Sequence, residues 1–255
     1  MPSSLRVDSL RALEEKTKSM KNITAAFSYL TFCRRFTNSH PPPAVLGTAA
    51  CYFPVIGLLL GMMLVGINHA LRNHLDPEIL SIVLATALTI ATGAIHIEGL
   101  QKTLDSRAGR SEGAANTDSS SAVGIVAILL VLLFKIKSIE ILHDNLVFGL
   151  LLMPVFARWA LVVFIYGSYR FSEGEAREIA QQLSFSGLLL TSIATLTLAT
   201  YLLGPTALWI GVYLSVFALI CRTIFQKRNG ALTTNHLGAV VELSETLCLI
   251  ALAWF

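Results

Sequence analysis

Long apolar segments that carry almost no charge dominate this sequence. A helix needs about 20 mainly apolar residues to cross the hydrocarbon core of a bilayer. Only 14% of the 255 residues are charged, whereas a soluble domain has about 25%, so an ordinary soluble protein is excluded. The pattern predicts an all-α integral membrane bundle with about seven transmembrane helices. The candidate spans are residues 44–71, 79–97, 119–142, 146–167, 187–203, 206–221 and 237–255.

The first 43 residues have a different character. Residues 1–21 are rich in lysine, arginine and serine and lack the long apolar core of a signal peptide. Residues 23–36 are mildly apolar and end in Arg34-Arg35, which predicts a helix that lies in the membrane interface. Three prolines at 41–43 then end any helix before the first span. We therefore expect two parts, a cytoplasmic or interfacial segment over 1–43 and a transmembrane domain over 44–255.

The distribution of lysine and arginine indicates the orientation. In a seven-span arrangement, residues 1–43 and the loops 101–118, 168–186 and 222–236 lie on one side. These segments carry 15 of the 19 lysines and arginines, and the opposite loops carry only Arg72. Because basic loops are retained in the cytoplasm, we expect this side to be cytoplasmic and the protein to reside in the plasma (inner) membrane. The net charge of only +3 gives no reason to expect a nucleic-acid partner.

Several ionisable residues lie inside predicted spans. Arg158 is near the middle of 146–167, and Glu242 and Glu245 are three residues apart in the last span. A charge in hydrocarbon requires a partner, so we expect Arg158 to pair with Glu242, with Asp105 or Asp118 as the next candidates. Whether such a pair is structural or functional stays open. Lys135 and Lys137 are expected to extend toward the outer interface.

A second polar group follows the second span. If that helix continues straight past His96, then Glu98, Lys102 and Asp105 lie four and seven residues apart, on one helical face. This arrangement is suited to a divalent cation, or to a phosphate bound through Lys102. An ordinary solvated helix end with a Glu–Lys pair explains it equally well. The following loop, 107–121, contains glycines, serines and Asp118, and fits either a phosphate and metal site or a plain loop.

Five motifs, in order, resemble those of the adenosylcobinamide-GDP ribazoletransferases, also called cobalamin synthases. The resemblance extends over most of the chain from Thr24 onward. One motif alone would be weak, but five in the same order on a chain of suitable length and hydropathy are fairly specific. The motifs occupy residues 52–61, 92–100, 157–160, 170–174 and 230–243.

The resemblance implies an enzyme that joins adenosylcobinamide-GDP to α-ribazole, or to its 5′-phosphate, and releases GMP. It also implies a requirement for Mg²⁺. The expected partners are these two substrates and the lipid bilayer, together with a second copy of the chain or other membrane-bound enzymes of corrinoid assembly. The implied metal ligands are Glu98, Asp105 and Asp118, the implied catalytic set is Lys102, Asp105, Asp118 and Arg158, and the implied cofactor-binding residues are His96, Gly238 and Glu242.

The sequence also departs from the family pattern. That pattern places acidic residues at 98, 102 and 105, whereas this chain has Lys102 in the centre. It has Asn235 where the pattern has aspartate, and Ser120 where it has arginine. Two other functions therefore stay open. One is a non-catalytic relative that binds the corrinoid or a membrane partner, and the other is a small transporter, although no internal repeat supports a transporter.

Overall fold

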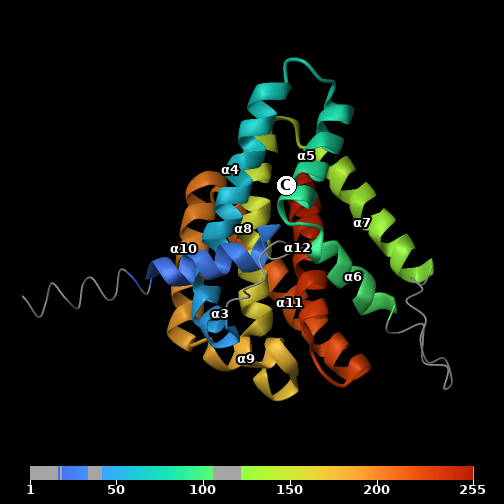
Figure 1. Cartoon of the computed structure of the whole chain (residues 1–255). Helices are drawn as coiled ribbons and strands as arrows, with labels where there is room; N and C mark the ends of the chain where they lie inside the picture. Colours follow the sequence, from blue (N-terminus) through green and yellow to red (C-terminus); the bar gives the residue numbers. More distant parts are fainter. Residues whose placement is uncertain (1–16, 18, 34–41, 106–121, 255) are drawn as a thin grey trace, which may run out of the picture.

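The computed structural model describes residues 17, 19–33, 42–105 and 122–254, and these residues form helices without strands (Figure 1). One isolated bridge joins Ser172 to Leu232. The all-α architecture predicted from the sequence is confirmed. The principal helices are α3 (Pro43–Ala49), α4 (Phe53–Leu71), α5 (Pro77–Ala91), α6 (Ile95–Asp105), α7 (Ala122–Ile141), α8 (Leu146–Ile165), α9 (Gly174–Gln182), α10 (Phe185–Leu203), α11 (Thr206–Asn229) and α12 (Thr234–Trp254).

Six of the described helices are long and apolar enough to cross a membrane. They are the continuous stretch Val45–Leu71, which ends in α4, and α7, α8, α10, α11 and α12. A seventh crossing exists only if α5 and α6 are taken together as one broken span. The helix over the sixth predicted span is longer than expected, because α11 continues past Cys221 to Asn229.

The second span is broken, and the expectation that it runs straight into residues 98–106 was wrong. The axes of α5 and α6 differ by 85°. The backbone turns at Gly93 and Ala94, whose φ angles of 63° and 57° are in the left-handed region. A side chain at Gly93 would place its Cβ 3.0 Å from the Cα of Phe32. Glycine therefore suits this position because of its left-handed φ angle and because of the close approach of Phe32. The break directs α6 away from α5 and along α12.

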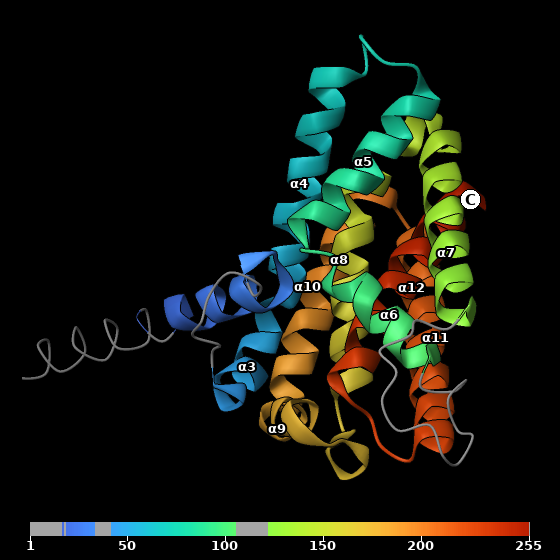
Figure 2. The same ribbon diagram turned by 45° about the vertical axis from the view of Figure 1, so that its right-hand side comes forward.

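Residues 19–30 form a helix that lies across the bundle and not along it (Figures 1 and 2). Ala26 and Leu30 are buried against the bundle, whereas Met20 is 62% exposed. The ring of Tyr29 stacks on that of Phe53 at the start of α4, with centroids 6.0 Å apart. A helix thus exists where the sequence predicts one over 23–36, although it begins earlier, by residue 19. Its position in the membrane interface stays a prediction.

Helix α8 is the centre of the bundle. Nearly all of its side chains from Leu150 to Ile165 are buried, and it packs against α4, α10, α11 and α12. Large residues such as Phe156 and Phe164 are fully enclosed. A polar side chain on α8 is therefore remote from water unless other helices supply polar groups beside it.

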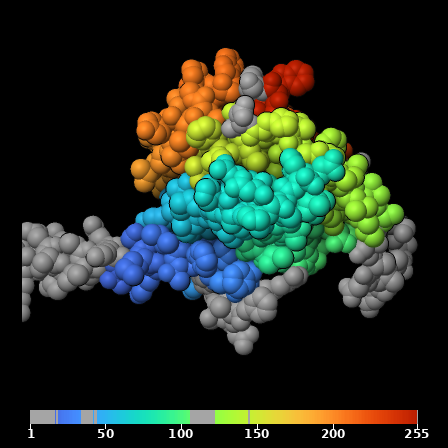
Figure 3. Space-filling view, turned by 90° about the horizontal axis from the view of Figure 1, so that it is seen from above, coloured from blue at the N-terminus to red at the C-terminus, as the bar shows by residue number. Residues whose placement is uncertain are grey.

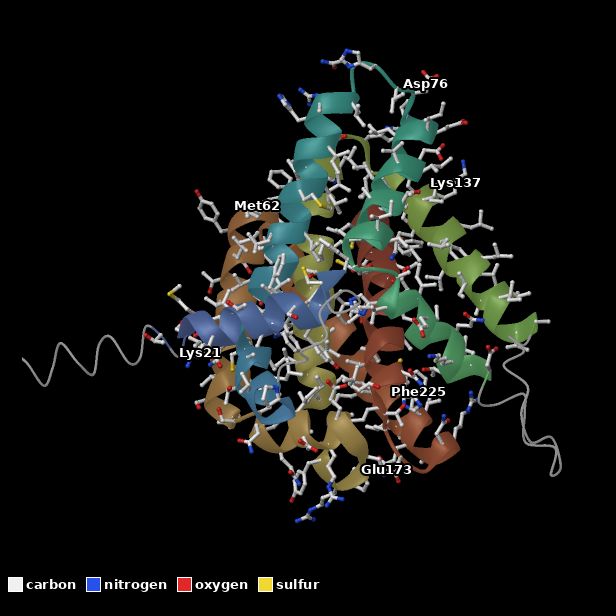
Figure 4. All side chains as sticks on the ribbon, viewed as in Figure 1. Lys21, Met62, Asp76, Lys137, Glu173 and Phe225 are labelled. Carbon is white, nitrogen blue, oxygen red and sulfur yellow. The ribbon has the colours of Figure 1, made fainter. Side chains whose placement is uncertain are left out.

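The two ends of the bundle are distinct. Glu173, before α9, and Phe225, near the end of α11, lie at one end, and Asp76 and Lys137 lie at the other (Figure 4). At the first end the Leu232 N–H donates to the Phe171 carbonyl (2.7 Å), and the Glu173 N–H donates to the Leu232 carbonyl (3.0 Å). The loops 168–186 and 222–236 are thus on the same side, as the charge pattern predicted. Most of the third loop, 101–118, falls outside the described residues, because residues 106–121 are not among them.

Candidate functional site

The motif at the start of α6 and the motif at the start of α12 meet where the two helices cross. A Cβ on Gly99 would lie 2.8 Å from the Asn235 carbonyl oxygen and 3.0 Å from the Cα of Gly238. A Cβ on Gly238 would lie 3.2 Å from the Cα of Gly99 and 3.3 Å from that of His96. The crossing therefore depends on two facing glycines, which allow the backbones to approach closely.

Helix α6 carries three of the predicted site residues. Lys102 Nζ donates to Glu98 Oε1 at 2.6 Å, and both side chains are largely accessible, at 56% and 41%. Asp105 ends the helix, and its carboxylate lies against Gly124 at the start of α7. The prediction that Glu98, Lys102 and Asp105 share one helix is confirmed, although that helix is α6 alone and not a continuation of α5.

The described residues include only part of the ligand set expected for Mg²⁺. Among residues 42–105 and 122–254, no three histidine, cysteine, aspartate or glutamate side chains are grouped so that they could hold a metal ion. Glu98 and Asp105 provide two carboxylates, with Lys102 between them along the chain. The third expected ligand, Asp118, lies outside the described residues. Carboxylate oxygen is the right donor for Mg²⁺, so the donor chemistry fits.

Four charged side chains form a cluster in the interior of the bundle. They come from three helices: Lys135 from α7, Arg158 from α8, and Glu242 and Glu245 from α12. Lys135 Nζ donates to Glu242 Oε1 and, at 2.7 Å, to Glu245 Oε2, while Arg158 Nη1 donates to Glu245 Oε1. Each of the four residues is at most 4% exposed. Two cations and two carboxylates make the cluster electrically neutral when all four are ionised.

This cluster corrects two expectations. Arg158 pairs with Glu245 and not with Glu242. Lys135 does not extend to the interface, because it is 2% exposed and joins both glutamates. Lys137, by contrast, is exposed and pairs with Glu140 at 2.7 Å. Sequence reasoning missed Lys135 as a partner. Two cations and two carboxylates inside three predicted spans, with charges that sum to zero, are a signal that could have indicated the cluster.

Two further features connect the cluster with the helix crossing. His96, 5% exposed on α6, lies close enough to Glu245 for an electrostatic interaction. Arg158 uses one of its nitrogens for Glu245, whereas its Nε and Nη2 have no hydrogen-bond partner among the described residues. His96 thus links the two features, because it lies beside Gly238 at the crossing and close to Glu245 in the cluster.

The turn before α12 is held by a histidine that the sequence analysis did not single out. The Thr233 N–H donates to His236 Nδ1 at 2.9 Å. The imidazole lies against the ring of Phe225 from α11, with centroids 5.0 Å apart. His236 thus fixes the start of α12, one residue after the Asn235 carbonyl that meets α6.

The comparisons with known proteins agree with the motifs. The family model described as cobalamin-5-phosphate synthase matches residues 22–253. The chain is 32% identical to the adenosylcobinamide-GDP ribazoletransferase of Pseudomonas aeruginosa strain UCBPP-PA14, over 92% of this chain and 99% of that protein. It is 29% identical to the protein of the same name from Geotalea daltonii, over 81% of this chain and 86% of that one. No solved structure matches.

Proposed function

Because the chain belongs to the cobalamin-5-phosphate synthase family, we propose that it joins adenosylcobinamide-GDP to α-ribazole, or to its 5′-phosphate, and releases GMP. The observation that carries this proposal is the α6–α12 crossing. Gly99 faces Gly238 there, which brings together two motifs that are more than 130 residues apart in the sequence. Helix α6 also carries two carboxylates, Glu98 next to Gly99 and Asp105 at the end of the helix.

The reaction is a displacement at phosphorus, in which a ribazole hydroxyl attacks and the bond to the departing GMP breaks. A protein accelerates such a step mainly by positioning the groups and stabilising charge. We assign Glu98 and Asp105, with Asp118, as ligands of Mg²⁺, which would neutralise charge on the diphosphate. Lys102, exposed at 56% of its side-chain area, is the cation nearest these carboxylates in the chain, and we assign it to phosphate contact.

The buried residues have a different part in this proposal. Full burial and the ion pair with Glu245 favour a positioning role for Arg158 over direct contact with phosphate. Glu242 and Lys135 complete the same cluster, which fixes α12 against α7 and α8. His96 and Gly238, at the crossing, then hold α6 in its register along α12.

We propose that the active end of the bundle faces the cytoplasm and that the bilayer is the plasma (inner) membrane. Two observations support this orientation: the concentration of lysine and arginine in the segments on one side, and the hydrogen bonds that join the loops 168–186 and 222–236 at that end. Lipid then covers the exposed apolar side chains of α7, α10 and α11, such as Leu133, Leu190 and Val216.

A non-catalytic relative is the second candidate, and the Lys102–Glu98 ion pair is the observation that favours it. In this pair, Glu98, one of the proposed metal ligands, is already bound to the ammonium group of Lys102. The test is to incubate the purified protein with adenosylcobinamide-GDP, α-ribazole and Mg²⁺ and to measure GMP release, with an Asp105→Asn variant as the control. We expect Mg²⁺-dependent release by the natural protein and almost none by the variant. Thermal stabilisation by adenosylcobinamide-GDP without any GMP release would establish the non-catalytic alternative.

A further inference from the structure

A pocket of about 340 Å³ with both polar and apolar lining lies at the end of the bundle opposite α9, between α4, α5, α7 and α8. Figure 3 views the molecule from this end, where α4 and α5 stand beside α7. Asn68 and Arg72 line the pocket from the end of α4, Glu140 from the end of α7, and His143 from the turn that follows α7. None of these residues belongs to the site assigned above.

Asn68 directs a buried polar group into this pocket. The residue is 3% exposed, and its side-chain oxygen has no hydrogen-bond partner within the described part of the chain. An amide oxygen buried in this way has lost its hydrogen bond to water without gaining another, which destabilises the empty pocket. The pocket therefore favours an occupant that donates a hydrogen bond to Asn68.

The charges around the pocket have both signs. Arg72 supplies a cation on one side, and Glu140 supplies a carboxylate on another, of which Oε2 accepts from the exposed Lys137. A second hollow of about 530 Å³ shares Glu140 and His143 with the first and adds the carboxylates of Asp76 and Glu78. An occupant with a cationic and an anionic group would match this distribution, whereas a purely anionic one would meet the carboxylates.

The remaining walls are apolar and extend to the surface of the bundle. Leu80, Leu84 and Ile139 line the inner side, and Val147, on α8, is 39% exposed. The pocket is formed where α4 ends and α5 begins, which is the end of a span and hence the depth of the lipid headgroups. Acyl chains beside such a pocket would contact the apolar wall.

We propose that this pocket binds the headgroup of a lipid of the phosphatidylethanolamine type. Its primary ammonium would donate to the Asn68 oxygen and to Glu140, and its phosphate would accept from Arg72. Phosphatidylcholine cannot replace it, since a quaternary ammonium has no N–H group. Phosphatidylglycerol cannot replace it either, since it brings no cation to the carboxylates. Soluble glycerophosphoethanolamine has the same polar chemistry but would gain nothing from the apolar wall.

The test is native mass spectrometry of the purified protein after exchange into micelles that contain equal amounts of phosphatidylethanolamine, phosphatidylcholine and phosphatidylglycerol. We expect phosphatidylethanolamine to be retained about tenfold more than either competitor, the ratio expected for a hydrogen bond to a charged donor. Asn68→Leu and Arg72→Gln should each remove this preference. Asn73→Leu, an exposed asparagine at the same end of the bundle, is the matched control and should retain it.

Three results would overturn the proposal. They are equal retention of the three lipids by the natural protein, loss of the preference in Asn73→Leu as well, and displacement of the lipid by an equimolar amount of glycerophosphoethanolamine. If Asn68→Leu does not fold, Arg72→Gln decides the question, because Arg72 is exposed. GMP release is not used as a readout, so failure here leaves the proposed activity unaffected.

Discussion

Each charge in the interior of this bundle depends on the others. Lys135 contacts both glutamates, and Arg158 contacts only Glu245. Removing one partner from a buried ion pair leaves an uncompensated charge, which is far more costly than removing an exposed pair. We therefore expect the free energy of unfolding to follow the net charge of the cluster, so that single and double substitutions in it give different results.

We expect Lys135→Met to lower the free energy of unfolding by about 3–5 kcal/mol, measured by denaturant titration in mixed micelles. The reason is that two buried carboxylates would share one cation. Lys137→Met is the matched control on the same helix. Because its pair with Glu140 is exposed, it should change the free energy of unfolding far less than Lys135→Met does.

The double variant Lys135→Met/Glu242→Gln restores a neutral cluster and should recover part of the lost stability. A double variant that is less stable than Lys135→Met alone would show that charge balance does not govern this region. The same experiment separates a positioning role from a purely structural one. If the cluster positions α12, GMP release should fall in Lys135→Met at temperatures at which the variant is still folded.

Lys102 lies between the two carboxylates of α6 along the chain and pairs with one of them, Glu98. We expect Lys102→Asp to lower the Mg²⁺ concentration for half-maximal GMP release by about two- to fivefold, since a cation at an exposed position repels Mg²⁺ only moderately. Mg²⁺-dependent thermal stability provides a second readout. Loss of activity in Lys102→Asp, with tighter Mg²⁺ binding, would instead identify Lys102 as a working phosphate ligand.

At the scale of elements, hydropathy predicted where the apolar helices lie but not how the second one ends. The predicted spans coincide closely with the helices because burial in lipid requires uninterrupted apolar sequence. The break between α5 and α6 depends on backbone conformation at Gly93 and Ala94, and alanine gives no indication of a left-handed turn. The sequence did not predict which carboxylates pair with Arg158 and Lys135 either, because these pairs depend on the relative rotation of three helices.

The α6–α12 crossing can be tested by filling the space between its two glycines. Gly99→Val should lower the free energy of unfolding by about 1–3 kcal/mol and reduce GMP release, because its side chain would meet the Asn235 carbonyl and Gly238. Gly66→Ala, in α4, is the control. A Cβ there meets nothing within 4 Å, so this change should be neutral or stabilising by up to about 1 kcal/mol. Equal effects of the two substitutions would contradict the crossing.

The whole molecule has two chemically different ends. The end with α9 gathers the basic loops and the α6–α12 crossing, whereas the other end holds Arg72 and the pocket beside Asn68. α12 begins at the first end and runs toward the second (Figure 1). This arrangement requires seven crossings, and we propose that the bent pair of α5 and α6 supplies one of them.

Cysteine accessibility tests this sidedness. The four natural cysteines, 33, 51, 221 and 248, are replaced, and single cysteines are introduced at positions 110, 228 and 74. We expect a membrane-impermeant maleimide to label 74 in intact cells, and to label 110 and 228 only after the membrane is opened. Labelling of 74 and 110 from the same face would show that α5 and α6 do not complete a crossing. Labelling of 110 and 228 from opposite faces would contradict the seven-span arrangement.

The position of the two glutamates in the last helix has a consequence for how the chain is made. Lys135 and Arg158 leave the ribosome long before Glu242 and Glu245, and each cation at the centre of an inserting helix costs about 2.5–3.5 kcal/mol. Until α12 is synthesised, α7 and α8 have no carboxylates of that helix beside them. Assembly therefore cannot be completed helix by helix in order of synthesis. The synthesis of α12 completes it, and a chain cut short before this helix would present two unmatched cations to the proteases of the membrane.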